Sequence, residues 1–296
     1  MNRFTFGLGY KEYNIDIDSC KFLVGNDIKT KFSIYSVIKS TFSKVNNSEY
    51  ATEDNKRHIM RYNDRQIDLK NWKLFEVTPF FDLETDMKMG SKSLMLKYLE
   101  CFGDSLEQSE IYSTLSILIN SLNEEFFDEQ TEISFGDKKI KFQIGEFNRG
   151  TLAKEIYPVI IANEYECNSA DMNYEDIILL QLSIIDRIVS KGIDNNAFIY
   201  CNIPYLTPKI KVMLYGIKYN NAFVLVDTNS IPKANVADIY ITGKYSIDLA
   251  NDEDINDKIM DLPFHIEKEE FKNIIYNCLL NQKLDYAQRL IVELFS

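Results

Sequence analysis

The chain of 296 residues carries a formal net charge of −12, and its hydrophobic fraction of 45% predicts a globular protein with a sizeable core. Five singly spread cysteines and only two histidines leave little material for a disulfide framework, a zinc site or a Ser-His-Asp triad. No apolar run approaches the length of a membrane helix and the N-terminus lacks the apolar stretch of a secretory signal, so we expect a cytoplasmic protein without membrane contact.

The charge is unevenly distributed along the chain. Residues 1–100 hold 16 basic and 14 acidic side chains, whereas residues 101–296 hold 17 basic and 31 acidic ones. Nucleic-acid binders usually present a basic face. If this chain binds DNA, a local patch, mainly in its first third, has to supply that face.

The first part of the chain predicts strands with one helix between them. Apolar residues alternate with polar ones over 4–8 and again over 13–17, which indicates a two-stranded antiparallel unit. A short apolar run then ends at Gly25, and apolar residues at helical spacing follow over 32–42. A further apolar strand is expected over 74–77.

The middle of the chain is predicted to be mainly helical. Apolar residues recur at steps of three and four within 91–130, and a second long helix is expected over 174–191. Between them, the turn pair at 136–137 is flanked by apolar triplets, which indicates a small hairpin over 133–142.

The last hundred residues return to an α/β pattern. Continuous apolar runs at 197–200 and 222–226 flank a helical segment over 208–219, which predicts a parallel crossover buried on both faces. Another strand is expected at 239–241, and an acidic helical tail follows from about 246.

The fold class expected from these elements is α/β. Residues 1–90 and 193–296 are predicted to form a discontinuous α/β head domain, and residues 91–192 a mainly α-helical leg domain inserted between them.

The segment after the strand that ends at Gly25 lies where a phosphate-binding loop is expected. Such a loop reads G-x-x-x-x-G-K-[ST], because glycines let backbone amides wrap phosphates, lysine reaches the outer phosphates and a hydroxyl binds Mg²⁺. Gly25 and Lys31 fit this pattern. The second glycine is replaced by Thr30, and the Mg²⁺ ligand by Phe32, which cannot coordinate a metal.

The ends of the later strands lack the expected catalytic groups as well. The strand at 197–200 is followed by Cys201 and Asn202, with no carboxylate to hold Mg²⁺ or polarise water. The strand at 222–226 is followed by Asp227, which we interpret as an ordinary strand-end aspartate. We therefore expect no bound nucleotide, no ATP hydrolysis and no catalytic residue.

The order and spacing of several segments resemble a known family. They are similar to the small ring-forming, DNA-end-binding accessory proteins of type II-A CRISPR spacer acquisition, a Csn-type family, in a longer subfamily form. No single motif is diagnostic, and the hairpin over 133–144 and the tail after about 243 look like additions. The segments that carry the resemblance are 22–24, 35–39, 68–78, 117–127, 172–182, 198–207 and 223–227.

This resemblance implies a fold, an assembly and partners. The fold would be a degenerate P-loop/ABC-ATPase-like head with an inserted α-helical leg. The assembly would be a homotetrameric ring with a positively charged hole that binds double-stranded DNA entered from an end. Calcium bound by acidic residues near the leg helices would support the ring. Partners would be the CRISPR integrase complex and the RNA-guided effector nuclease, in antiviral defence.

The resemblance supplies no fixed DNA-contact motif, so we select basic residues of the first third by charge. The candidate DNA-binding residues are Lys29, Lys31, Lys39, Lys44, Lys56, Arg57, Arg61 and Arg65. The segment that matches the family's acidic stretch is interrupted by uncharged residues, so calcium is only a possible cofactor. Its candidate ligands are Glu166, Asp171, Glu175 and Asp176.

Two other functions stay open at this point. An active P-loop-type NTPase with an unusual loop is supported only by Gly25 and Lys31. A protein-interaction adaptor that binds no nucleic acid fits the acidic character of the last two thirds of the chain.

Overall fold

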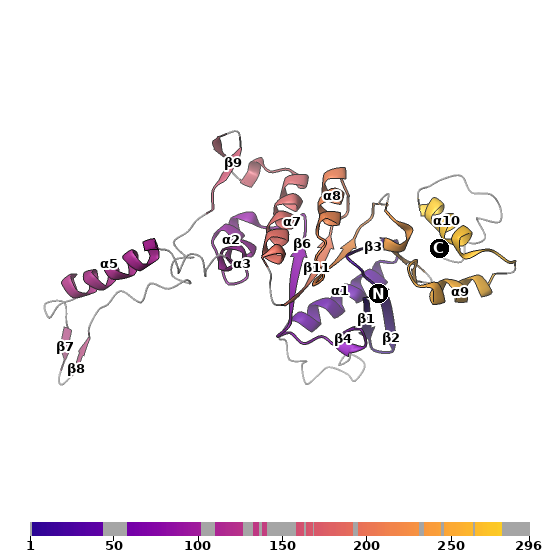
Figure 1. Ribbon diagram of the computed structural model, residues 1–296, viewed down its shortest axis with the longest axis horizontal. Coiled ribbons are helices and arrows are strands. Elements are labelled where there is room, and N and C mark those ends of the chain that lie inside the picture. Colours follow the sequence, from indigo (N-terminus) through magenta and orange to yellow (C-terminus); the bar gives the residue numbers. More distant parts are fainter. Residues whose placement is uncertain are drawn as a thin grey trace. The chain divides into compact units, whose positions relative to one another are not determined.

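The computed structural model describes residues 2–43, 58–101, 110–126, 133–135, 138–140, 158–162, 164–167, 169–191, 195–230, 234–243, 246–262 and 264–279. It has a mixed α/β fold (Figure 1). The chain divides into two compact units, one of residues 1–81 and 174–296 and the other of residues 82–173. The helix over 174–190 is therefore grouped with the α/β unit, whereas the boundary drawn from the sequence at 192 assigned it to the leg.

A six-stranded sheet forms the centre of the first unit. Its order is β14 (Ile247–Asp248), β13 (Ile239–Thr242), β3 (Cys20–Gly25), β12 (Ala222–Asp227), β11 (Asn196–Asn202) and β6 (Trp72–Val77). Neighbouring strands from β13 to β6 are parallel, and β14 pairs antiparallel with β13. The parallel pairing predicted for the two apolar runs is confirmed, since sheets buried on both faces select such continuous apolar strands.

A second, antiparallel sheet covers part of one face of the first. Its order is β2 (Lys11–Asp16), β1 (Arg3–Leu8), β4 (His58–Tyr62) and β5 (Arg65–Gln66). The predicted pairing of the first two strands is confirmed. The strands β4 and β5 were not predicted, because their segment is largely polar and only Met60 of β4 is fully buried.

The two faces of the central sheet are covered by different helices (Figure 1). On one face, Leu23 of β3 packs in a core shared with Phe4 of β1 and Ile34 of helix α1 (Ile28–Phe42). On the other face lie α7 (Tyr174–Ser190) and α8 (Pro208–Gly216), as the ring contact between Phe22 and Tyr215 of α8 indicates. The helices expected at these places are confirmed.

The C-terminal segment is integrated into this first unit. Ile247 and Leu249, around β14, are fully buried. The helices α9 (Asp252–Met260) and α10 (Lys268–Leu279) follow, which confirms the helical tail. The short strand β14 was not predicted.

The second unit is made of short elements and one longer helix. The elements are α2 (Leu83–Met87), α3 (Leu94–Glu100), α5 (Glu110–Phe126), the hairpin of β7 (Ile133–Phe135) and β8 (Lys138–Ile140), and the hairpin of β9 (Ile160–Ala162) and β10 (Tyr165–Cys167). The described residues of the periodic segment 91–130 include the helices α3 and α5, and the hairpin after it is confirmed, whereas the second hairpin was not predicted. Within the described parts of the chain, no helix has the length and apolar character needed to cross a bilayer.

Candidate functional site

The turn between β3 and α1 can accommodate only glycine at its first position. Gly25 has a φ of 111°, which L side chains rarely adopt. A Cβ atom at this position would lie 2.0 Å from the carbonyl oxygen of Thr242 on the neighbouring strand. The strand, turn and helix therefore follow one another in the order expected from the sequence, and the turn itself requires glycine.

The N-terminus of α1 is capped by a side chain of the protein itself. The carboxylate of Asp27 accepts hydrogen bonds from the backbone N–H groups of Lys29 (3.0 Å) and Thr30 (3.2 Å) and from the Thr30 hydroxyl (2.7 Å). The hydroxyl hydrogen bond is the main cause that lowers the pKa of Asp27. In a phosphate-binding loop, such amides face a phosphate. Here they are bound by a carboxylate.

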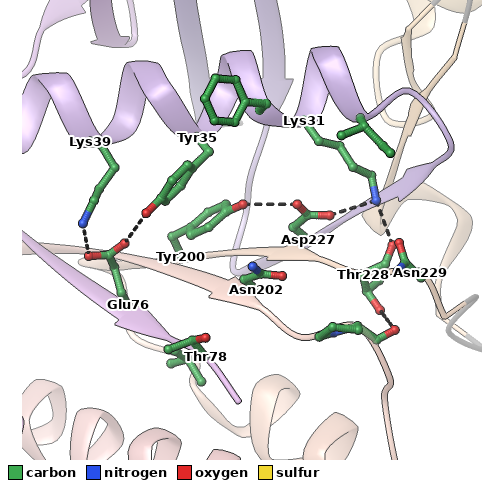
Figure 2. Close-up of a pocket in the computed structure, with 14 residues that line it drawn as sticks. Lys31, Tyr35, Lys39, Glu76, Thr78, Tyr200, Asn202, Asp227, Thr228 and Asn229 are labelled. Carbon is green, nitrogen blue, oxygen red and sulfur yellow. Dashed lines mark hydrogen bonds and ion pairs between the residues drawn. The ribbon is translucent and has the colours of Figure 1, made fainter. Parts of the chain in front are cut away.

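The side chain of Lys31 is also engaged internally (Figure 2). Its Nζ atom lies 2.8 Å from Oδ1 of Asp227, at the end of β12, and donates a hydrogen bond of 3.0 Å to the carbonyl oxygen of Thr228. The Lys31 side chain is only 7% exposed. The second oxygen of Asp227 accepts a hydrogen bond from the Tyr200 hydroxyl at 3.2 Å. Burial is the main cause that raises the pKa of Tyr200 well above its usual value, so this hydroxyl stays protonated and donates.

A second cluster of the same composition lies two turns further along α1. Lys39 pairs with Oε2 of Glu76 at 2.6 Å, and the Tyr35 hydroxyl donates to Oε1 of Glu76 at 3.4 Å. The two clusters touch, because the rings of Tyr35 and Tyr200 have centroids 5.1 Å apart. Lys31, Tyr35 and Lys39 are spaced by four residues and therefore share one face of the helix.

These side chains line a pocket of about 660 Å³. It lies between α1 and the carboxyl ends of β6, β11 and β12, which is where ligands bind in open α/β sheets (Figure 2). Its lining residues are Ile28, Lys31, Phe32, Tyr35, Lys39, Glu76, Val77, Thr78, Tyr200, Asn202, Pro204, Asp227, Thr228 and Asn229.

The candidate DNA-binding residues differ in their surroundings. Lys29 and Arg65 are exposed. Lys39 pairs with Glu76, and Arg61 pairs with Glu12 at 3.1 Å.

Lys31 is buried in its ion pair, which argues against a contact with DNA phosphate in this conformation. Lys44, Lys56 and Arg57 lie outside the described residues.

The candidate calcium ligands fall in both units. Glu166 and Asp171 belong to the second unit, whereas Glu175 and Asp176 begin α7 in the first. The Glu175 carboxylate accepts a hydrogen bond from the Thr207 hydroxyl and pairs with Lys209 at 3.0 Å.

These two contacts, the Thr207 hydrogen bond first, lower the pKa of Glu175. In the part of the chain that the structure describes, no cluster of three or more His, Cys, Asp or Glu side chains is arranged to hold a metal. Calcium stays a prediction.

Reasoning from the sequence missed the roles of Tyr35, Glu76, Tyr200 and Asp227. Asp227 was interpreted as an ordinary strand-end residue, yet it pairs with the lysine that fits the loop pattern. The four-residue spacing of polar side chains along α1 is a signal that could have marked the helix face that lines the pocket.

Comparisons with known proteins show a shared fold but no family and no function. No family model matches the chain, and no curated protein matches it. The crystal structure of Stu0660 of Streptococcus thermophilus is similar, with a TM-score of 0.68 at 14% sequence identity. The match covers 98% of this chain and 92% of that one. The two proteins therefore share a fold over nearly their whole lengths.

Proposed function

We propose that this chain is a non-catalytic subunit of a ring that binds the ends of double-stranded DNA in CRISPR spacer acquisition. The head would be a degenerate P-loop/ABC-ATPase-like domain, and the inserted unit its leg. The observation that carries the non-catalytic part is the ion pair of Lys31 with Asp227. The DNA-binding part rests on the family resemblance of the sequence.

Charges in the pocket oppose a nucleoside triphosphate. The lysine that would reach the outer phosphates is neutralised by Asp227, and the amides at the start of α1 are bound by Asp27. A triphosphate would have to displace both carboxylates, and the remaining lysine of the pocket, Lys39, is already paired with Glu76. Because charges inside a pocket are weakly screened, the repulsion between these carboxylates and a triphosphate is larger than at an open surface.

Groups that would hold Mg²⁺ and activate water are also replaced. Phe32 stands where a hydroxyl ligand is needed, and its side chain is 66% exposed. The strand β11 ends in buried Cys201 followed by Asn202, neither of which is a carboxylate. These replacements support a head that keeps the shape of an ATPase without its chemistry.

The architecture supports the proposed relationship to P-loop proteins. The strand that ends at Gly25 lies between two parallel neighbours, β12 and β13, and it leads through a tight turn into α1. A separate compact unit, residues 82–173, interrupts the α/β unit in the sequence.

The proposal also includes a homotetrameric ring, calcium that supports the ring, and contacts with the integrase complex and the effector nuclease.

A band-shift titration tests the central claim, that the ring binds the ends of double-stranded DNA. Linear duplex should bind better than a closed circle of the same sequence, because a ring is entered from an end. Equal affinity for both would contradict threading, and absence of binding at low salt would favour the adaptor.

A titration with Mg-ATP separates the proposal from the active NTPase. We expect no saturable binding of the triphosphate and no phosphate release by the full chain. Turnover that disappears in Lys31→Ala would overturn the non-catalytic assignment in favour of an NTPase.

A further inference from the structure

The pocket between α1 and the strand ends has a polar but electrically neutral lining. Its charged side chains are two lysines and two carboxylates, and they pair at 2.8 Å and 2.6 Å. A tyrosine hydroxyl donates to each carboxylate. Because all four charges are matched inside the protein, the lining favours an uncharged ligand over a phosphate or an amine.

Two amide side chains in the lining are available for hydrogen bonding. Asn202 follows the buried part of β11 and Asn229 follows β12, and both are exposed. Neither side-chain amide makes a hydrogen bond to another described residue. Figure 2 shows Asn202 between the Tyr200–Asp227 pair and Thr78. An asparagine amide donates and accepts side by side, which is the pattern that adenine and other nucleobases complement.

The α1 side of the pocket presents apolar surface to solvent. Ile28 is 78% exposed and Phe32 is 66% exposed, and their four-residue spacing puts them on one helix face. Phe32, Asn202 and Asn229 line the same pocket. An exposed aromatic ring together with hydrogen-bonding amides is a combination with which proteins stack and read single bases.

We propose that this pocket binds a nucleobase, stacked on Phe32 and hydrogen-bonded by Asn202. The base could come from a free nucleoside or from an unpaired nucleotide at a DNA strand end. The second source rests on the proposed DNA binding, whereas the first does not. The pocket volume of about 660 Å³ lies in the range of small-molecule sites.

The test is a saturation-transfer NMR titration of the full chain with adenosine, with ATP and with ribose. Adenosine should bind with a Kd of about 1 mM or tighter and ATP more weakly, because only ATP brings its charges to Asp227 and Glu76. Ribose should show no saturable signal. Phe32→Ala and Asn202→Leu should each weaken adenosine binding about fivefold or more.

Asn202→Gln, which keeps the amide, should recover part of the affinity that Asn202→Leu loses. Phe80→Ala is the matched control, because Phe80 is 88% exposed and does not line the pocket. Thermal melts check that each variant is folded. ATP that binds more tightly than adenosine would overturn the proposal. So would adenosine binding that none of the pocket variants changes, or no saturation by about 10 mM adenosine.

Duplexes with and without a short single-stranded overhang identify the source of the base. If Asn202→Leu weakens binding of the overhang duplex but not of the blunt one, the strand end supplies the base. If both duplexes bind as before while adenosine binding falls, the ligand is the free nucleoside. A chain that binds adenosine but no duplex would refute the proposed DNA function and leave the pocket inference intact.

Discussion

Oδ1 of Asp227 lies 2.8 Å from Nζ of Lys31, so a carboxylate of the protein occupies the position next to this lysine that a phosphate would need. The pair ties α1 to the end of β12. At the start of the helix, the carboxylate of Asp27 accepts hydrogen bonds from two backbone N–H groups. Lys31 and the first backbone N–H groups of α1 are thus satisfied by side chains of the protein itself.

Removal of Asp227 should expose a latent anion site. In Asp227→Ala, the nearly buried Lys31 loses its counter-charge. We expect the free energy of unfolding to decrease by about 2 kcal/mol. This cost is smaller than that of breaking a fully buried ion pair, because the Asp227 side chain is 18% exposed. Inorganic phosphate should raise the melting temperature of this variant and not that of the wild type. Urea unfolding and thermal melts at several phosphate concentrations measure both effects. Equal phosphate responses in the two proteins would argue against the latent site.

Asp27 should make the stability of the chain depend on pH in acid. The pKa of Asp27 in the folded protein is lower than its ordinary value of 3.8. The ionised carboxylate therefore stabilises the folded state at neutral pH, and this stabilisation is lost as the pH falls through the folded-state pKa. We expect the wild type to exceed Asp27→Asn in stability at pH 7, with the difference shrinking as the pH falls below about 4. Asp27→Ala, which removes the cap entirely, should cost about 1 kcal/mol at pH 7.

Urea unfolding between pH 3 and pH 7 checks both statements. Because asparagine is also a good N-cap, Asp27→Asn separates the charge from the cap. A difference between wild type and Asp27→Asn that is constant over this range would show that the charge contributes nothing.

The C-terminal segment should be required for a stable head. Lys21 of β3 and Asp248 of β14 form an ion pair with side chains that are 1% and 0% exposed. Lys21 also donates to the carbonyl of Ala237 at 2.7 Å, and Asp248 accepts from the backbone N–H of Asp16 at 2.7 Å. Asp248→Asn leaves the buried Lys21 without an anion and should cost about 3–5 kcal/mol.

The double variant Lys21→Met with Asp248→Leu is the control. Because it removes both charges, it should be less destabilised than the sum of its two single variants. Urea unfolding measures the cycle. Additive effects would mean that the two side chains do not act as a pair. A chain shortened after residue 243 should lack this buried partner of Lys21 as well and be unstable.

Lys56 and Arg57 should contribute to DNA binding through phosphate contacts. Reversal of both charges, by Lys56→Glu and Arg57→Glu, should weaken binding of linear duplex and lower the slope of log K against log salt by about 0.9 for each phosphate that is no longer neutralised. Lys218→Glu, an exposed change in the acidic part of the chain, is the matched control. Band shifts at several salt concentrations give the slopes. A slope equal to that of the control would remove both residues from the interface.

Local sequence signals determined most of the elements. The alternation around Phe4 and Phe6 predicted β1, and the continuous apolar runs predicted the parallel pair of β11 and β12, because burial on one or two faces sets these patterns directly. Gly25 ended the apolar run that predicted β3, and the structure shows that only glycine fits so close to Thr242. The departures from the phosphate-binding-loop pattern at Thr30 and Phe32 could also be recognised from the sequence, because the pattern is defined by residue types at fixed spacing.

Pairings between distant segments were decided only by the tertiary structure. Lys31 meets Asp227, Lys39 meets Glu76, and the ring of Tyr35 contacts that of Tyr200 because α1 crosses the carboxyl ends of strands from three separate parts of the chain. The periodicity of apolar residues within a segment does not show which distant segments this helix will cross. The sequence therefore indicated which residue types stand at the ends of these elements, whereas only the structure showed that Asp227 and Glu76 pair with Lys31 and Lys39 in the lining of one pocket.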